Sequence, residues 1–444
     1  MKKAVSSVLL ASSILTTAAL ATNGDNLIGA GPVSRGMGGS GIGLPVETDS
    51  IFTNPAWISE YDGSNNDSAI FSFGGTIFQP NVKARVQMPM YLDTNGDGSG
   101  DFMTSVSRKA KSRADMFMIP EIALLKKAGK HLTFGVGAFG VSGMGADYRD
   151  IRPEAFSQVN TAFQYLSFIP AFSFETDGFH AGLGLNIAYG ALAIGAVQCQ
   201  QNMDGSINVP TCQQRGSGLS TSIGTGILFG LGYKIMDMLY LGFNYKSQVD
   251  MEYKNVFDFN LDGNYDNLEL DQPVEYGFGV GVDLGIVRFV ADWKKIKWSE
   301  ADGYSDFGWE DQDVYSLGAE ATFGRLKVRL GYNNGNSPIK DKLLKDSDAL
   351  PGSANGNLGS DYGMSQFGVS YFNLLGFPAI SEEHYTIGLG YKITGGFSLD
   401  FAYTYSPANK ITHESDPANT MLRNVKITAS NEQSAFTAAL RYNF

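Results

Sequence analysis

Apolar and polar residues alternate along most of the chain from residue 68 to its end. In the last run Phe436, Ala438, Leu440, Tyr442 and Phe444 share one parity, and the positions between them are polar or small. A period of two residues is typical of a β-strand that has one apolar side. The pattern predicts 14 strands, over residues 68–80, 115–127, 131–143, 161–175, 178–195, 217–235, 239–253, 272–284, 286–299, 313–323, 326–334, 382–393, 397–406 and 431–444.

Short and long connectors alternate between these runs. Each run reaches the roughly 9–11 residues with which a tilted strand crosses a bilayer. Lipid offers no hydrogen-bond partner, so a sheet in the membrane must close on itself. We therefore predict an all-β fold, a 14-stranded antiparallel transmembrane β-barrel, with short turns at its periplasmic end and long loops at its extracellular end.

Charged residues fall on the parity that the apolar residues leave free. Because hydrocarbon excludes charge, this parity faces the lumen. It carries Glu275, Asp283, Arg288, Asp292, Lys294, Glu320, Lys327 and Arg329. A desolvated carboxylate ligand needs a cation or hydrogen-bond donors, so Arg288, Lys327 and Arg329 are candidate head-group contacts. The alternative is that these cations pair with the acidic residues of the same wall.

A glycine-rich segment precedes the first strand. Residues 29–43 hold too many glycines for a stable helix or strand, since glycine loses the most backbone entropy on ordering. Met37, Ile42, Ile51, Phe52 and Trp57 make residues 29–57 too apolar for a free linker. We predict that residues 22–66 form a small N-terminal plug, called the hatch below, inside a barrel of residues 67–444.

The first 21 residues have the features of a secretory signal peptide. Two lysines come first, an apolar run follows, and Ala19-Leu-Ala21 ends it. A membrane anchor is the alternative, but no charge cluster follows the run. With 54 glycines and 12% aromatic residues, the exported chain fits an outer-membrane barrel better than a periplasmic enzyme.

The net charge of −12 argues against a nucleic-acid partner. Two cysteines, Cys199 and Cys212, lie 13 positions apart in a polar loop. In an oxidising compartment they are expected to form one disulfide bond that closes this loop. Two free thiols are the alternative.

An acidic stretch of the first long loop has the spacing of a calcium-binding loop. Asp93, Asn95, Asp97 and Asp101 offer oxygen ligands, and glycine occupies the sixth position. The twelfth position is Thr104 where such loops place a bidentate glutamate. Structural calcium and a solvated acidic turn both remain open, and no other cofactor is expected.

The sequence gives little support for catalysis. None of its 4 histidines has a serine at triad spacing, and no His/Cys cluster has metal-ligand spacing. We expect a protein that is not an enzyme.

Two motifs near the N-terminus resemble the FadL family of outer-membrane transporters for long-chain fatty acids and other hydrophobic molecules. They are Arg35-Gly-Met-Gly-Gly-Ser-Gly and Asn54-Pro-Ala56. Trp293, Trp298-Ser299, the run from Tyr385 to Tyr391 and the terminal phenylalanine add to the resemblance. The family's architecture is a 14-stranded barrel with an N-terminal hatch, so the resemblance covers essentially the whole mature chain.

The resemblance implies capture of a hydrophobic ligand among the outer loops and its lateral release through a gap in the wall. In the family the third strand kinks inward there, beside the Asn-Pro-Ala of the hatch. The residues so implied are Arg35, Gly38, Gly39, Asn54, Pro55 and Ala56 in the hatch, and Gly135, Gly137, Gly140 and Gly143 in the third strand.

The residue types suit that role, because glycine weakens strand pairing and proline fixes the backbone beside Asn54. The alternatives are a plain turn at Asn54 and glycines that are merely frequent in every strand.

We expect a monomer in the outer membrane of a Gram-negative bacterium, with lipid and a hydrophobic small molecule as partners. A general diffusive porin and a structural or adhesive barrel are the alternative functions. The sequence does not identify the substrate.

Overall fold

The structure is a computed structural model that describes residues 22–61, 65–92, 102–151, 156–199, 211–260, 262–393 and 396–444. The predicted signal peptide, residues 1–21, lies outside the described residues. Within them, no helix has the length and apolar character needed to span a bilayer.

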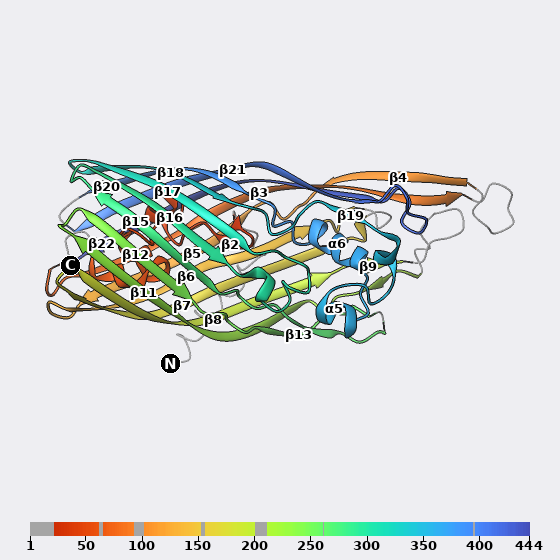
Figure 1. The fold of residues 1–444 in the computed structure, drawn as a ribbon, viewed down its shortest axis with the longest axis horizontal. Coiled ribbons are helices and arrows are strands. Elements are labelled where there is room, and N and C mark those ends of the chain that lie inside the picture. The colour runs from red at the N-terminus through yellow and green to blue at the C-terminus, as the bar shows by residue number, and fades with distance from the viewer. Residues whose placement is uncertain are drawn as a thin grey trace, which may run out of the picture.

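The described residues form a closed antiparallel barrel of 14 strands, as predicted (Figure 1). Successive wall strands pair with each other, and the last strand pairs with the first to close the sheet. The wall consists of β3 (Ala69–Leu92), β5 (Phe117–Lys127), β6 (Leu132–Asp147), β7 (Asn160–Thr176), β8 (Phe179–Gly195), β11 (Leu219–Ile235), β12 (Leu239–Lys246), β15 (Glu275–Asp283), β16 (Val287–Ile296), β17 (Gln312–Phe323), β18 (Leu326–Gly335), β20 (Glu383–Lys392), β21 (Phe397–Ser415) and β22 (Lys426–Asn443).

Exposed apolar side chains cover the outside of this wall. Along β5 buried and exposed residues alternate at every position. Phe73 of β3, Met118 and Ile122 of β5 and Phe134 of β6 are exposed, whereas Glu121 of β5 is buried inside. This is the pattern of a barrel whose outer face meets lipid.

The first strand is longer than predicted. It runs on to Leu92 and pairs with β4 (Phe102–Lys111) as a hairpin that extends beyond the outer end of the barrel (Figure 1). Val82, Ala84 and Val86 continue the period of two and are buried on one side. Lys83 and Arg85 alternate with these residues, and for this reason the sequence after Pro80 was predicted to be a polar loop.

The outer loops carry further elements that lie at the right-hand end of Figure 1. The loop between β18 and β20 holds the helix α6, in which Ser365 Oγ accepts a hydrogen bond of 3.1 Å from Gly368 N. Helices in this loop were not predicted. The loop elements are β9 (Val197–Gln198), β10 (Gln213–Gln214), β13 (Glu252–Phe257), β14 (Asp266–Glu269), η4 (Trp298–Glu300), β19 (Lys342–Leu344), η5 (Asp346–Ala349), α5 (Gly356–Ser360) and α6 (Gln366–Leu375).

The hatch lies within the barrel, toward the short turns, as the red and orange ribbon in Figure 1 shows. Met37, Leu44, Ile51 and Trp57 are fully buried, so the barrel wall supplies the surroundings that order this glycine-rich segment. Its elements are β1 (Thr22–Asn23), β2 (Asn26–Leu27), α2 (Pro32–Gly36), η1 (Glu47–Asp49), α3 (Ser50–Thr53) and η2 (Pro55–Ser59).

Candidate functional site

A carboxylate of the wall holds the middle of the hatch. Asp292 of β16 accepts hydrogen bonds from Gly41 N at 2.7 Å, Ile42 N at 2.9 Å and Gly43 N at 2.9 Å. Three amides that converge on one carboxylate stabilise its negative charge without a cation. A Cβ on Gly43 would lie 2.4 Å from a backbone nitrogen of β15, so glycine is required for this close approach.

The guanidinium of Arg35 is buried between the hatch and the seam where β22 meets β3. Its Nε donates to Gly29 O at 3.2 Å, and its Nη1 donates to Thr437 Oγ1 at 3.2 Å and also to Thr76 Oγ1. Arg35 thus ties the first turn of the hatch to the strands that close the barrel.

Gly38 and Gly39 form a turn with positive φ angles of 72° and 79°. Gly38 N donates to Thr386 Oγ1 at 3.0 Å, and Gly38 O accepts from Asn333 Nδ2 at 3.1 Å. A Cβ on Gly38 would lie 2.6 Å from a carbonyl oxygen of the wall, so only glycine fits there.

Asn54-Pro55-Ala56 lies mainly against β7, β8 and β11, and Ser173 Oγ of β7 donates a hydrogen bond of 2.8 Å to Ala56 O. Asn54 Oδ1 accepts from Ala56 N at 3.1 Å, and Asn54 Nδ2 lies 3.2 Å from Leu231 O of β11. A Cβ on Gly182 of β8 would lie 2.2 Å from the Pro55 carbonyl carbon. Among the described residues the Asn54 side chain makes its hydrogen bonds to the hatch and to β11 and none to the third strand, although the η2 turn also approaches β6. Gly182 of β8 leaves the room for the tripeptide.

The third strand, β6, separates from β5 while it stays paired with β7. Its pairing with β5 stops at Phe139, opposite Glu121, and its pairing with β7 shifts register between Gly140 and Ser142. Residues 141–146 are buried on both parities. A β-bulge that bends a strand in this way ends its pairing on one side.

The N-terminal segment of the hatch is the partner of this kink. Asn26 of β2 pairs with Ser142, and Gly143 N donates to Asp25 O at 3.1 Å. The sequence did not indicate this partner, because main-chain hydrogen bonds leave no signature in residue type.

The four predicted kink glycines fall into two pairs. Gly140 and Gly143 lie where β6 turns inward, and a Cβ on Gly140 would come within 2.4 Å of Ile119 Cγ2. Gly135 and Gly137 lie below the kink, in the part of β6 that pairs regularly with β5.

The kink opens a break in the β5–β6 ladder, which we call the window. Its lower edge is the pair Glu121–Phe139, and its upper edge is the hydrogen bond of 2.9 Å from Arg113 N to Asp147 O. Buried apolar side chains line its inner side: Leu27, Phe78, Ala114, Phe117, Ile119 and Ala435. On the β5 side the exposed residues are Arg113, Asp115, Met116, Met118 and Pro120. Buried apolar side chains of the interior and exposed side chains of the outer surface thus lie at the two sides of this break.

The three cations predicted to contact a head group lie near the short turns, each beside a carboxylate. Arg329 has no exposed side-chain surface; its Nε lies 2.6 Å from Glu320 Oε2 and its Nη1 2.7 Å from Asp400 Oδ1. Arg288 Nη2 lies 2.6 Å from Glu320 Oε1.

Lys327 connects the same network to the hatch, since its Nζ lies 3.6 Å from Glu47 Oε1. Arg441 Nη1 lies 3.3 Å from Glu47 Oε2. This geometry supports the alternative of ion pairs that fasten the hatch, and it does not support a head-group site for Arg288, Lys327 and Arg329.

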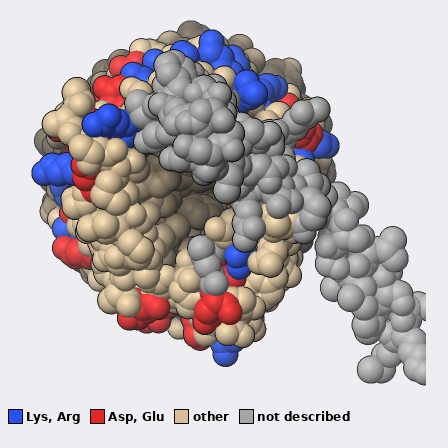
Figure 2. All heavy atoms as spheres, turned by 90° about the vertical axis from the view of Figure 1, so that its right-hand side faces the viewer, with Lys and Arg blue, Asp and Glu red and all other residues tan. Residues whose placement is uncertain are grey.

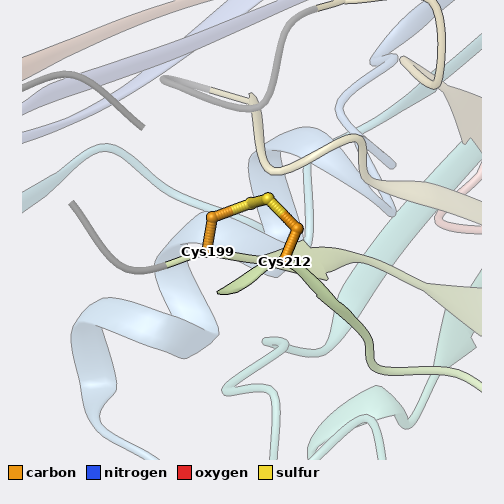
Figure 3. The surroundings of a disulfide bond; sticks show 2 residues. All are labelled: Cys199 and Cys212. Carbon is orange, nitrogen blue, oxygen red and sulfur yellow. A yellow bond between two sulfur atoms is a disulfide. The ribbon is translucent and has the colours of Figure 1, made fainter. Parts of the chain in front are cut away.

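Cys199 and Cys212 are joined by a disulfide bond that closes the outer loop between β9 and β10 (Figure 3). The candidate calcium ligands Asp93, Asn95, Asp97 and Asp101 lie outside the described residues.

The outer end of the molecule is hollowed. Figure 2 looks onto this end, and the visible wall of the hollow consists mostly of uncharged residues, with charged residues gathered mainly around its rim. Below the outer loops the buried residues are strongly aromatic, with Tyr148, Phe163, Tyr253, Trp298 and Trp309 among them. These surroundings would favour an apolar molecule over a charged one.

A sequence model described as outer membrane protein transport protein (OMPP1/FadL/TodX) matches residues 8–277. A second model, described as Gram-negative porin, matches residues 217–373. No curated protein matches the chain in sequence.

Several solved structures share the fold. A Pseudomonas aeruginosa FadL homologue is 14% identical, with a TM-score of 0.67 over 94% of this chain and 99% of that chain. The P. putida toluene transporter TodX is 17% identical, with a TM-score of 0.64 over 94% and 99%. The Ralstonia pickettii toluene transporter TbuX is 15% identical, with a TM-score of 0.59 over 94% and 99%. Because the first family model matches more than half of the chain, the protein belongs to the OMPP1/FadL/TodX family of outer-membrane transport proteins.

Proposed function

We propose that this outer-membrane transporter of hydrophobic compounds takes up small aromatic molecules and releases them sideways into the membrane through the window. The break in the β5–β6 ladder is the observation that carries this proposal. It places the apolar cluster around Ile119 next to the exposed Met116 and Met118.

The magnitude of the hydrophobic effect favours this route. Release toward the periplasm would expose the ligand to water at about 25 cal/mol for each Å² of apolar surface. It would also pass the ionic network of Glu47, Lys327 and Arg441 at the short-turn end of the hatch. A side exit keeps the ligand in apolar surroundings throughout.

Two observations favour an aromatic substrate over a fatty acid. The three cations that could have held a carboxylate head group are engaged in ion pairs close to the short turns. The solved structures that share the fold include two named toluene transporters. Uptake of neutral aromatic molecules is therefore the form of the function that we propose.

The test is uptake of radiolabelled toluene by cells that express Gly140→Val. The added side chain meets Ile119 Cγ2, which a Cβ at residue 140 would approach to 2.4 Å. Overpacking of this kind costs about 1–3 kcal/mol. A barrier raised by about 1.4 kcal/mol lowers a rate about tenfold, and we expect uptake to fall by roughly this factor.

The matched control is the double variant Gly140→Val/Ile119→Ala, which removes the side chain that the valine meets. It should recover uptake, and both variants should keep the heat-modifiable mobility of a folded barrel. Normal uptake by Gly140→Val would contradict release through the window. A large steady ion conductance of the wild-type protein would instead favour a diffusive porin.

A further inference from the structure

Several polar side chains are buried where the hatch meets the kink of β6. Four backbones lie side by side at this level: Asn26 pairs with Ser142, Ser142 with Tyr165, and Tyr165 with Gly190. This row crosses from the hatch through β6 and β7 to β8. It passes directly beside the window, at the inner mouth of the proposed exit.

Several buried polar atoms in or beside this row have no hydrogen-bond partner in the part of the chain that the structure describes, among them Ser142 Oγ, Asn186 Oδ1 and Tyr253 Oη. Asn186 donates from Nδ2 to Tyr165 Oη at 3.1 Å, but its Oδ1 is unpartnered. Tyr253 is fully buried, and its unpartnered Oη packs against Gly190, whose Cβ position would lie only 1.9 Å away. A buried polar atom without a hydrogen-bond partner destabilises the folded protein, so a polar group of a ligand that bonds to it would be favoured here.

Asp25 adds a carboxylate to the same region. It is fully buried, and its Oδ2 accepts a hydrogen bond from Tyr304 Oη. None of the ion pairs among the described residues includes Asp25. Burial raises the pKa of Asp25 to about 7.

The half-buried cations nearby already have a carboxylate. Lys246 Nζ lies 3.4 Å and Lys294 Nζ 3.6 Å from Glu275 Oε2. Glu275 also accepts a hydrogen bond of 2.8 Å from Asn26 of the row. A ligand carboxylate would therefore be repelled by the carboxylate of Asp25, and both lysines already pair with Glu275.

Aromatic rings surround these polar atoms. The rings of Trp298 and Tyr304 are 4.6 Å apart, and those of Trp298 and Trp309 are 5.2 Å apart. Trp298 packs directly on Gly24, the residue before Asp25. Phe163 meets Tyr253 edge to face at 6.2 Å. A flat apolar body would be favoured in these surroundings.

We propose that this buried row binds the hydroxyl group of a neutral phenol, which makes phenols the preferred substrates of the transporter. A phenol hydroxyl donates one hydrogen bond and accepts another. Asp25 and Asn186 offer the acceptors, and Tyr253 Oη offers the donor. A hydrocarbon leaves these groups unpartnered, and an ionised carboxylate cannot donate to the acceptors.

The inference rests on the proposed function and narrows its substrate class. Isothermal titration calorimetry of the purified full chain at neutral pH tests it with three probes of one shape: p-cresol, toluene and p-toluate. A site built for a hydroxyl rejects analogues that lack it. We expect p-cresol to bind at least about tenfold more tightly than the other two, as one buried hydrogen bond implies.

Two variants and one control test whether these buried polar groups cause the preference for p-cresol. Tyr253→Phe and Asp25→Leu should each reduce the preference for p-cresol over toluene while toluene binding stays unchanged, because leucine removes the acceptor that asparagine would keep. Tyr148→Phe removes another buried, unpartnered hydroxyl outside the row and should keep the preference.

Equal affinities for p-cresol and toluene in the wild-type protein would overturn the inference and leave aromatic uptake standing. A preference that survives both Tyr253→Phe and Asp25→Leu would also overturn it. Failure of all three probes to bind would count against the proposed function itself.

Discussion

Single carboxylates and guanidinium groups fasten the hatch to the barrel. Asp292 binds three consecutive amides, and Asp49 accepts from Val33 N at 3.1 Å and Ser34 N at 3.0 Å. The parity of the strands placed Asp292 in the lumen correctly, but its partners could not be predicted. Backbone amides attract a carboxylate whatever their residue type, so the sequence carries no mark of them.

Arg329 is the residue whose loss should cost most in stability. Arg329→Ala removes this buried partner from Glu320 and Asp400, which keep Arg288 and Arg441, so the cost should reach at most the roughly 3–5 kcal/mol of a buried pair broken outright. The midpoint of urea unfolding should fall accordingly. Lys295→Ala is the control, because the partly exposed pair of Lys295 with Asp313, at 3.0 Å, should contribute less than about 1 kcal/mol.

The same variant tests the head-group hypothesis. If Arg329 only fastens the network, its loss should reduce uptake of toluene and of a fatty acid to the same extent. Selective loss of fatty-acid uptake would show that Arg329 does contact a carboxylate ligand.

At the scale of elements, all predicted strands are present, because strict alternation between lipid and lumen leaves a strong pattern. The ends of the strands were predicted less well. β3 continues past Pro80, and β12 ends at Lys246, where the chain leaves the wall before the short strand β13. A strand remains in the wall only as far as its partner strand pairs with it. The apolar and polar pattern of one strand does not show where that pairing ends.

The kink of β6 was predicted in part. The third strand was predicted to bend from its glycines, and it does bend at Gly140. The partner of the bend was predicted as Asn54 and is the segment at Asp25 and Asn26. Glycines occur in nearly every strand of this chain, so their positions could not show which ones, such as Gly182, make room for the hatch.

The outer loops contain a carboxylate latch between η5 and the connection from β21 to β22. Asp346 Oδ1 accepts from Thr420 N at 3.0 Å and from Met421 N at 2.8 Å. Hydrogen bonds from these amides, that of Thr420 first, lower the pKa of Asp346 to about 2. The latch therefore contributes its full stability above the ordinary aspartate pKa of about 3.9 and loses it as the pH falls through about 2.

Amide chemical shifts of Thr420 and Met421 measure this transition. They should titrate with a midpoint near pH 2 in the wild-type protein and should not titrate in Asp346→Asn. A midpoint near the ordinary aspartate value would contradict the latch.

At the scale of the whole molecule, the hatch fills the part of the lumen near the short turns. Deleting residues 22–57 removes Arg35, Asn54 and all three amides that Asp292 binds. Because a wide barrel without a plug leaves an aqueous channel, we expect conductance in planar bilayers to rise well above that of the wild-type protein. Heat-modifiable mobility serves as the control for folding. An unchanged conductance of the folded deletion variant would show that the hatch does not block the lumen.

The central claim is the route by which a hydrophobic molecule leaves the barrel. The most direct measurement is photolabelling with a diazirine-bearing aromatic substrate during uptake, followed by identification of the labelled peptides. If the molecule leaves through the window, labels are expected on its two sides. These are residues 114–120, at the start of β5 and just before it, and residues 140–146 of β6. Labels confined to the short-turn side of the hatch, around Glu47, Lys327 and Arg441, would contradict it.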